Sequence, residues 1–188
     1  MRLEPRKNAH IVVESMEKLR RRGVTATLDI FGDGSERPQL EEMCRSLGVE
    51  KSVRFHGTVP QTAVVDALTQ MDILCFPSTA SEGFPKAVFE ALAAGVPVVS
   101  TGVSVLGHLI HQGIGRQISS PDSESLAAAV EDLVSDPSRF ATISAQAHEA
   151  SRQYSMENWR KTIAALLEEQ WGLSRSTARS GESVASQV

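Results

Sequence analysis

The chain has 188 residues, of which 41% are hydrophobic and 22% are charged, and its formal net charge at pH 7 is −4. This length suffices for one domain with a sizeable core, and the composition is that of an ordinary globular protein. The negative charge argues against general nucleic-acid binding, and no signal peptide or apolar run of membrane-spanning length is found, which favours a cytoplasmic protein.

Helices and strands alternate over the first part of the chain. The pattern predicts a helix capped by Asn8, a strand over residues 26–31, a helix that ends at Gly48, a strand over residues 53–56 and a helix over residues 60–71. Further strands are expected over residues 73–76, 96–100 and 115–119, with helices over residues 85–94 and within 104–112. This alternation predicts an α/β fold with a Rossmann-like, doubly wound parallel sheet, whose ligands bind at the carboxyl ends of the strands.

Positive charge gathers near the end of the first expected helix. Residues 1–22 hold seven lysines and arginines against three glutamates, and four of these cations lie between Lys18 and Arg22. Cations at the end of a helix interact favourably with its dipole, so the pattern favours a solvated helix end. The alternative is a weak peripheral contact with an anionic membrane surface.

After residue 119 the pattern is helical. Three helices are expected to begin near Ser123, Asp136 and Ser155, and the last is expected to face inward through its apolar side chains, which are Trp159, Ile163, Leu166 and Leu167. Residues 172–188 have almost no apolar anchors, which predicts a disordered tail. The sequence therefore predicts one domain over residues 1–171 and a tail over residues 172–188.

Two cysteines, Cys44 and Cys75, lie on an apolar helix face and in an apolar strand. Their spacing fits neither a disulfide framework nor a set of metal ligands, so both are expected to be small core residues in a reducing compartment. No His, Cys and Asp cluster suggests a metal site.

One carboxylate stands alone in the helix expected over residues 85–94. Every residue between Lys86 and Gly95 is apolar except Glu90. A helix that is apolar all round is typical of an interior, where an unpaired carboxylate is costly. An ion pair with Lys86 would contribute only about 0.2–0.5 kcal/mol, so we expect Glu90 to face a polar ligand such as sugar hydroxyls.

Glycines follow several of the expected strands, at Gly32-Asp33-Gly34, at Gly57 and at Gly83. Because the carboxyl ends of parallel strands meet at one edge, these segments predict a single crevice. Gly83 directly precedes a helix N-terminus, where free N–H groups and the dipole favour a phosphate. No P-loop or dinucleotide-binding fingerprint is found in the sequence. His56 is interpreted as an ordinary polar residue at the end of a strand in preference to a catalytic one.

The segment EGFPKAVFEALAAGVPVVST, with seven residues between Glu82 and Glu90, resembles the signature of the retaining GT-B glycosyltransferases of family 4, group 1. The segments MRLEPRKN, LDIFGDG and VRFHGTV resemble the Arg-and-Lys loop, the glycine turn and the base-side strand of that family. The resemblance covers residues 2–171. It implies the C-terminal half of a GT-B fold, which binds a nucleotide-sugar donor for transfer with retention.

The resemblance also implies roles for single residues. Arg2 and Lys7 would grip the donor diphosphate and steady the leaving nucleotide, and Glu82 would contact the donor sugar. Glu90 would accept hydrogen bonds from the ribose. His56 and Gly57 would lie near the base, and the backbone at Gly83 and Phe84 would hold phosphate. The expected nucleotide-sugar-binding residues are, together, Gly32, Asp33, Gly34, His56, Gly57, Gly83, Phe84, Pro85, Lys86 and Glu90. No metal or other cofactor is implied, because Arg2 and Lys7 would supply the positive charge.

Three features depart from the family pattern. Family members carry a separate N-terminal acceptor domain and a first strand ahead of the Arg-and-Lys loop, whereas this chain begins inside that loop. A sheet without that strand would leave a central position unfilled or an edge unpaired. Ser104-Val105 and His108 stand where the family usually places two glycines and a glutamate, which predicts a shifted specificity or a decayed site.

Three functions therefore remain open. The first is the donor-binding half of a cytoplasmic glycosyltransferase that needs an acceptor domain in cis or in trans, with peripheral contact to the inner face of the membrane as an option. The second is a nucleotide-sugar-binding subunit of a two-chain enzyme. The third is a degenerate or epimerase-like GT-B relative.

Overall fold

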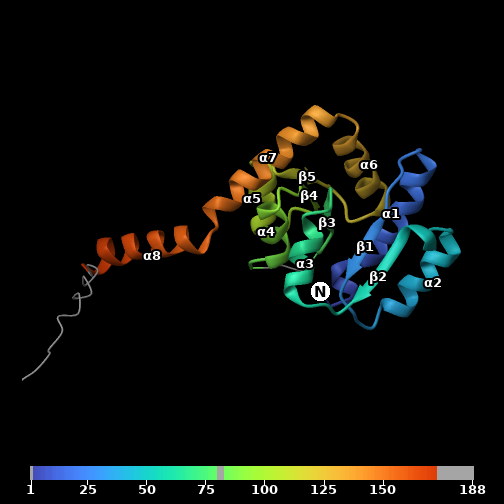
Figure 1. The fold of residues 1–188 in the computed structure, drawn as a ribbon, viewed down its shortest axis with the longest axis horizontal. Helices are drawn as coiled ribbons and strands as arrows, with labels where there is room; N and C mark the ends of the chain where they lie inside the picture. The colour runs from blue at the N-terminus through green and yellow to red at the C-terminus, as the bar shows by residue number, and fades with distance from the viewer. Residues whose placement is uncertain (1, 80–82, 173–188) are drawn as a thin grey trace, which may run out of the picture. The chain divides into compact units, whose positions relative to one another are not determined.

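The computed structural model describes residues 2–79 and 83–172, so Glu82 and the expected tail from residue 173 onward lie outside the described part of the chain. The chain divides into two compact units, Met1–Arg152 and Gln153–Val188. The first unit contains both β-sheets (Figure 1), and the second contains α8 (Met156–Trp171).

Two sheets form in the described residues, and every pairing in them is parallel. In one sheet β1 (Leu28–Phe31) pairs with β2 (Val53–Gly57), and in the other β4 (Val98–Ser100) lies between β3 (Leu74–Phe76) and β5 (Gly115–Gln117). Strand β4 begins two residues later than expected. Pro97, which precedes it, has no N–H to donate to a ladder, and its carbonyl accepts from the N–H of Leu74 at 2.9 Å.

Helices connect and follow these strands. They are α1 (Ala9–Arg21), α2 (Arg37–Leu47), α3 (Gln61–Leu68), α4 (Lys86–Ala93), α5 (Val105–His111), α6 (Ser123–Val134) and α7 (Pro137–Gln153). Gly48 ends α2 with a φ of 66°, the side chain of Asp122 caps α6 by accepting from the N–H of Ser125, and Pro137 opens α7. The α/β fold expected from the sequence is confirmed.

The sheet is interrupted between β1 and β3 (Figure 1). In the doubly wound order 3-2-1-4-5-6, this break falls at the place of the first strand. All three residues of β4 are buried, whereas β1 and β3 are mostly half-buried. The sequence predicts an unfilled central position or an unpaired edge, and the described residues form two separate sheets with a break between them.

The first residues of the chain lie beside the carboxyl end of β1. Arg2 forms a parallel bridge with Asp33, and the N–H of Leu3 donates to the carbonyl of Asp33 at 2.9 Å. Leu3 is completely buried. The short helix η1 (Pro5–Lys7) then leads into α1.

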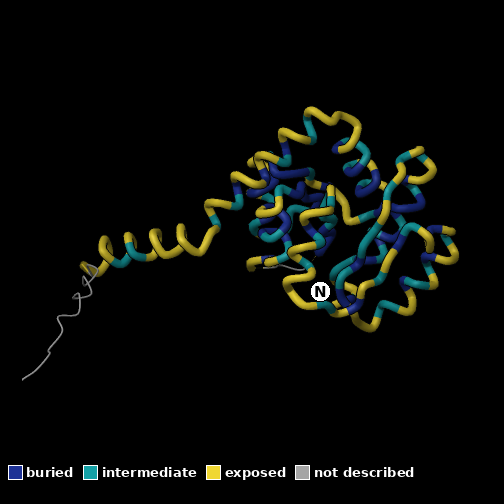
Figure 2. The backbone as a smooth tube through the Cα atoms, viewed as in Figure 1, coloured by how far each residue is buried: buried dark blue, intermediate teal, exposed yellow. Residues whose placement is uncertain are grey.

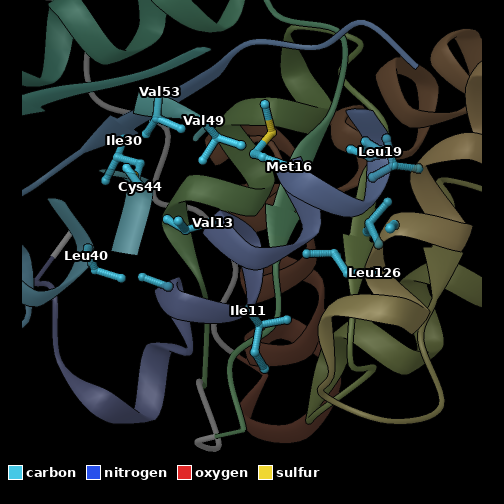
Figure 3. Packing of buried hydrophobic residues seen from close by; sticks show 14 of the residues in the cluster. Ile11, Val13, Met16, Leu19, Ile30, Leu40, Cys44, Val49, Val53 and Leu126 are labelled. Atoms are coloured by element: carbon cyan, nitrogen blue, oxygen red, sulfur yellow. The ribbon is translucent and has the colours of Figure 1, made fainter. Parts of the chain in front are cut away.

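The main core joins the face of the β1–β2 sheet to α1, α2 and α6. Figure 3 shows Val13 of α1 near Leu40 and Cys44 of α2, and Leu19 of α1 near Leu126 of α6. In Figure 2 the buried segments run through the inside of this unit, with exposed residues on the outer turns of its helices. Burial of these side chains is the main stabilising contribution to the unit.

The cations at the end of α1 are paired with carboxylates. Lys18 and Arg22 both pair with Glu124 of α6, while Arg20 and Arg21 pair with Glu17 one turn earlier. The positive cluster thus helps to join α1 to α6, which supports a role in the fold.

Asn8 occupies the N-cap position of α1, but the expected side-chain cap is wrong. Its backbone is left-handed, with φ of 54° and ψ of 37°, a conformation that asparagine tolerates better than most residues. Its Nδ2 instead donates to the carbonyl of Pro77 at 2.9 Å. Asn8 thereby links the start of α1 to the end of β3.

One expectation about burial is also wrong, that for α4, and the one for α8 stays a prediction. In α4, Val88, Phe89, Ala91 and Leu92 are buried, but Lys86 and Ala93 are exposed and Glu90 is half-buried, so this helix lies at the surface along one side. In α8 no residue is buried, and Trp159, Ile163 and Leu166 are each more than two-fifths exposed. Within its own unit α8 has no second described element against which this apolar face packs.

Candidate functional site

The segments that leave β3 and β4 meet the N-terminal loop at one edge of the molecule. The carbonyl of Arg6 accepts from the N–H of Thr79 and from the hydroxyl of Ser78, each at 3.4 Å. The hydroxyl of Thr101 donates to the carbonyl of Ser78 at 2.6 Å, and Ser78 is 1% exposed. These bonds bring the expected Arg-and-Lys loop to the carboxyl ends of both strands.

The glycine segments after β1 and β2 meet at the same edge. The N–H of Gly32 donates to the carbonyl of Gly57 at 2.8 Å, and Asp33 Oδ2 lies 3.2 Å from Arg37 Nη1. Gly57 has a φ of 66°, and a Cβ placed at Gly34 would lie 2.4 Å from the carbonyl oxygen of Leu3. Gly57 is therefore favoured by its backbone conformation and Gly34 by lack of space.

Three cations stand on the N-terminal loop. Arg2 Nη1 lies 3.6 Å from Glu4 Oε1, and Arg6 Nε donates to Glu4 Oε2 at 3.0 Å. Lys7 Nζ lies 5.9 Å from the centre of the Phe76 ring. The sequence interpretation named Arg2 and Lys7 but missed Arg6, although it stands in the same Pro-Arg-Lys run.

The segment before α4 is exposed. Gly83 and Phe84 lie at the surface, and the Phe84 ring stacks on Phe89 with the ring centres 3.9 Å apart. Pro85 is the N-cap residue of α4, and Lys86 is its first helical residue. The first N–H groups of a helix lack helical acceptors and point outward, so this end can receive an anion.

Glu90 contacts a residue that the sequence interpretation missed. Its Oε1 accepts from Nε2 of Gln61, the first residue of α3, at 2.6 Å. The alternative ion pair between Lys86 and Glu90 does not form among the described residues. The sequence around Gln61 carries no signal for this contact, because its partner lies 29 positions later in the chain.

His56 belongs to a polar cluster on the β1–β2 sheet. Asp29 accepts from Arg54 at 2.9 Å and lies 2.6 Å from His56 Nε2, while the Phe31 ring stacks on the imidazole at 4.3 Å. Partial burial acts to raise the pKa of Asp29, but hydrogen bonds from His56 and Arg54 together hold that pKa below its usual value. Asp29 was missed by the sequence interpretation, although the register places it opposite Arg54.

The segment that leaves β4 carries a strained residue. Ser104 has a φ of 55° and a ψ of −135°, a region that is almost confined to glycine. In α5 the ring of His108 lies 3.1 Å from Gln112. The position at which the sequence departs from the family pattern is therefore also one of backbone strain.

Neither cysteine is suited to act as a nucleophile. Cys44 is buried in the main core, and burial raises the pKa of the Cys75 thiol to about 12. A reactive cysteine needs a thiolate, which neither site favours. Cys44 is confirmed as a core residue, and Cys75 is half-buried and packs against the same core. In residues 2–79 and 83–172, no group of three His, Cys, Asp or Glu side chains is placed to hold a metal ion.

Two surface hollows lie away from this edge. A hollow of about 170 Å³ is lined by residues that precede β1 and β2, among them Val24 and Ser52, and one of about 310 Å³ lies along α2 beside Phe55. The first is at the amino ends of the strands, opposite to the edge at which parallel sheets bind ligands. Neither hollow replaces the carboxyl edge as the candidate site.

Comparison with known families decides the kind of protein. The sequence model described as "Glycosyl transferases group 1" matches residues 1–154. The chain belongs to this family.

Related group 1 enzymes are considerably longer than this chain. D-inositol 3-phosphate glycosyltransferase from Rhodococcus jostii is 31% identical over 175 residues, which cover 89% of this chain and 38% of that protein. A GDP-mannose-dependent mannosyltransferase from Mycolicibacterium smegmatis is 30% identical over 176 residues, which cover 89% of this chain and 45% of that protein. The chain thus spans less than half the length of these relatives.

Solved structures confirm the C-terminal half of a GT-B fold for this group 1 glycosyltransferase chain. HepE from Anabaena, solved in complex with UDP, is 25% identical with a TM-score of 0.78, over 90% of this chain and 47% of that chain. The C-terminal domain of a group 1 glycosyl transferase from Francisella tularensis is 20% identical with a TM-score of 0.70, over 82% of this chain and 83% of that domain. As for the membrane, none of the helices described here has the length and apolar character needed to cross it.

Proposed function

We propose that the carboxyl edge of this chain binds a nucleotide-diphosphate sugar, and that the sugar passes to an acceptor with retention of configuration. The observation that carries the proposal is the meeting of the cationic N-terminal loop with the segments that leave β3 and β4. The free N-terminus of α4 and the Glu90–Gln61 pair add groups that suit a phosphate and a ribose. HepE was solved in complex with UDP and has the same kind of fold as this chain, which supports the proposal that this chain binds a nucleotide.

The charges suit a leaving nucleotide. When the bond between the sugar and the diphosphate breaks, negative charge grows on the phosphate oxygen that leaves. Arg2 and Lys7 would stabilise this charge, and the backbone N–H groups of Gly83, Phe84 and Lys86 would hold a phosphate at the start of α4. Pro85, which has no N–H to donate, would border this phosphate as the N-cap residue. We propose that these groups act without a metal ion.

The remaining roles follow the path of the nucleotide. Glu90 would accept from the ribose, His56 and Gly57 would lie beside the base, and Gly32, Asp33 and Gly34 would border the crevice. Glu82 would contact the sugar hydroxyls. In this proposal the two glutamates bind the donor, and they are not the acid and base pair of a glycoside hydrolase.

We further propose that an acceptor domain, joined to this chain or supplied by another, completes a cytoplasmic enzyme. The size of the relatives supports this, because the matched region is 38% of the Rhodococcus protein and 45% of the Mycolicibacterium protein. A second candidate function is that of a relative with shifted or lost transferase activity. The observation that favours it is the backbone strain at Ser104, in the segment that follows β4.

Titration calorimetry of the chain with UDP, GDP and their common sugar conjugates tests the proposal. We expect one base to bind, and Glu90→Ala to weaken that binding by about 1–3 kcal/mol, the scale of a lost charged hydrogen-bonding partner. Thermal unfolding serves as the control that the variant is folded. A folded wild-type chain that binds neither nucleotide would refute the proposed donor site.

A further inference from the structure

The contact between Gln61 and Glu90 joins two helices at the candidate site. Gln61 begins α3 and Glu90 lies within α4, 29 positions later, and their side chains are 2.6 Å apart between Nε2 and Oε1. Gln61 is exposed and Glu90 is half-buried, so a ligand can reach the pair.

Packing between the helices holds this contact in place. Val64 and Leu68 stand three and seven positions after Gln61, which puts all three on one face of α3. Val64 and Leu68 pack in a small apolar cluster with Ala91, the neighbour of Glu90 in α4. The position of Gln61 relative to Glu90 is therefore set by burial, with the hydrogen bond at its exposed end.

The chemistry of the two groups fixes which atom faces which. An ionised carboxylate only accepts hydrogen bonds, so Gln61 must present its nitrogen to Glu90 and turn its carbonyl oxygen away. Within the described part of the chain, neither Gln61 Oε1 nor Glu90 Oε2 receives a hydrogen bond from a protein donor. Two such acceptors on adjacent side chains match the two O–H donors of a vicinal diol.

Gln61 stands close in sequence to the expected base subsite, and its partner Glu90 belongs to the expected ribose subsite. Gln61 follows Gly57, on the expected base side, by four residues, and Glu90 is the expected ribose acceptor. Resting on the donor-binding function proposed above, we propose that Gln61 is a binding residue that reads the ribose diol together with Glu90. Gln61 Oε1 accepts from one hydroxyl and Glu90 Oε2 from the other.

The test compares nucleotides with and without one of these hydroxyls. UDP, 2′-deoxy-UDP and 3′-deoxy-UDP, or the three corresponding guanosine nucleotides if guanosine is the base that binds, are titrated into the whole chain and into Gln61→Ala. The wild type is expected to prefer the ribonucleotide about tenfold, the scale of one hydrogen bond. In Gln61→Ala the preference over one of the two deoxynucleotides is expected to fall close to one, while the preference over the other, whose missing hydroxyl faces Glu90, is expected to remain.

Gln70→Ala is the matched control, since Gln70 is an exposed glutamine just beyond the other end of α3. It is expected to keep both the affinity and the preference of the wild type, and thermal unfolding checks that each variant folds. Tenfold preferences over both deoxynucleotides that survive in Gln61→Ala overturn the role of Gln61 and leave the donor site standing. Absence of any nucleotide binding by the folded wild type overturns the donor site itself and the diol reading with it.

Discussion

Arg2, Glu4 and Arg6 form a small charge cluster on the N-terminal loop. Glu4 lies between the two arginines, and the side chain of Arg2 is 85% exposed. Exposed ion pairs contribute little to stability, commonly less than about 1 kcal/mol. A diphosphate carries more negative charge than one carboxylate, so it can draw Arg2 away from Glu4 at little cost.

Arg2→Ala is therefore expected to weaken binding of a nucleoside diphosphate about tenfold, and to leave binding of the nucleoside unchanged. Calorimetric titration with UDP and uridine, or GDP and guanosine, measures both. Arg45→Ala removes an exposed arginine of α2 that pairs with Glu42, and it should alter neither affinity. Equal losses for diphosphate and nucleoside would contradict a phosphate role for Arg2.

Ser104 carries backbone strain that a glycine would remove. A residue in this part of backbone space costs of the order of 1–3 kcal/mol, whereas glycine adds about 0.5–1 kcal/mol of unfolded-state entropy. Ser104→Gly is therefore expected to raise the free energy of unfolding by about 1 kcal/mol in a urea titration.

The control for this substitution is Ser119→Gly, in an exposed loop where the backbone φ is not positive. At this position glycine relieves no backbone strain, and it raises the conformational entropy of the unfolded chain. The free energy of unfolding should therefore fall by about 0.5–1 kcal/mol. Two variants that change in the same direction would show that Ser104 is not strained in solution.

The site was predictable from the sequence where a residue type stands out from its neighbours. Glu90 stands out in an apolar helix, and Gly57 marks the end of a strand. Gln61 and Asp29 do not stand out in this way, because their partners Glu90 and His56 lie 29 and 27 positions away and only the fold brings them together. Contacts of this kind depend on strand register and helix packing, which one sequence does not display.

At the scale of secondary structure elements, alternation and stop signals were enough to order the strands and helices. Their boundaries moved where a local group intervened, as Pro97 did for β4. The inward face expected for α8 stays a prediction, because apolar spacing shows that a face exists and says nothing of what covers it. The same limit applies to α4, whose apolar residues do not all become buried.

The packing of α6 on α1 offers a test of the core. Leu126 is completely buried in the cluster that includes Leu19. Leu126→Ala is expected to lower the free energy of unfolding by about 2–5 kcal/mol, because it removes buried surface and leaves a cavity. Leu166→Ala, at a position that is 51% exposed, should change it by less than about 0.5 kcal/mol, and comparable losses in the two variants would contradict this account of the core.

At the scale of the whole molecule, charges that are separated in the sequence are partly joined in the fold. Lys18 and Arg22 belong to the positive first segment, and they meet Glu124 and Glu131 of α6 from the acidic remainder. The sequence alone suggested a solvated helix end, and the structure adds a partner for it. The family and the fold class were predictable at this scale because they depend on order and spacing along the whole chain.

The unpaired edges of β1 and β3 expose this chain to self-association in concentrated solution. An open edge is a template for a strand of another molecule, and charges or very short strands are the usual protection. Asp29 places a charge within β1, whereas β3 consists of Leu74, Cys75 and Phe76 and is protected only by its length of three residues. We expect the apparent molar mass from light scattering to grow with protein concentration during gentle heating, from contacts that begin at β3. An apparent molar mass that stays at the monomer value at every concentration would show that this edge is closed.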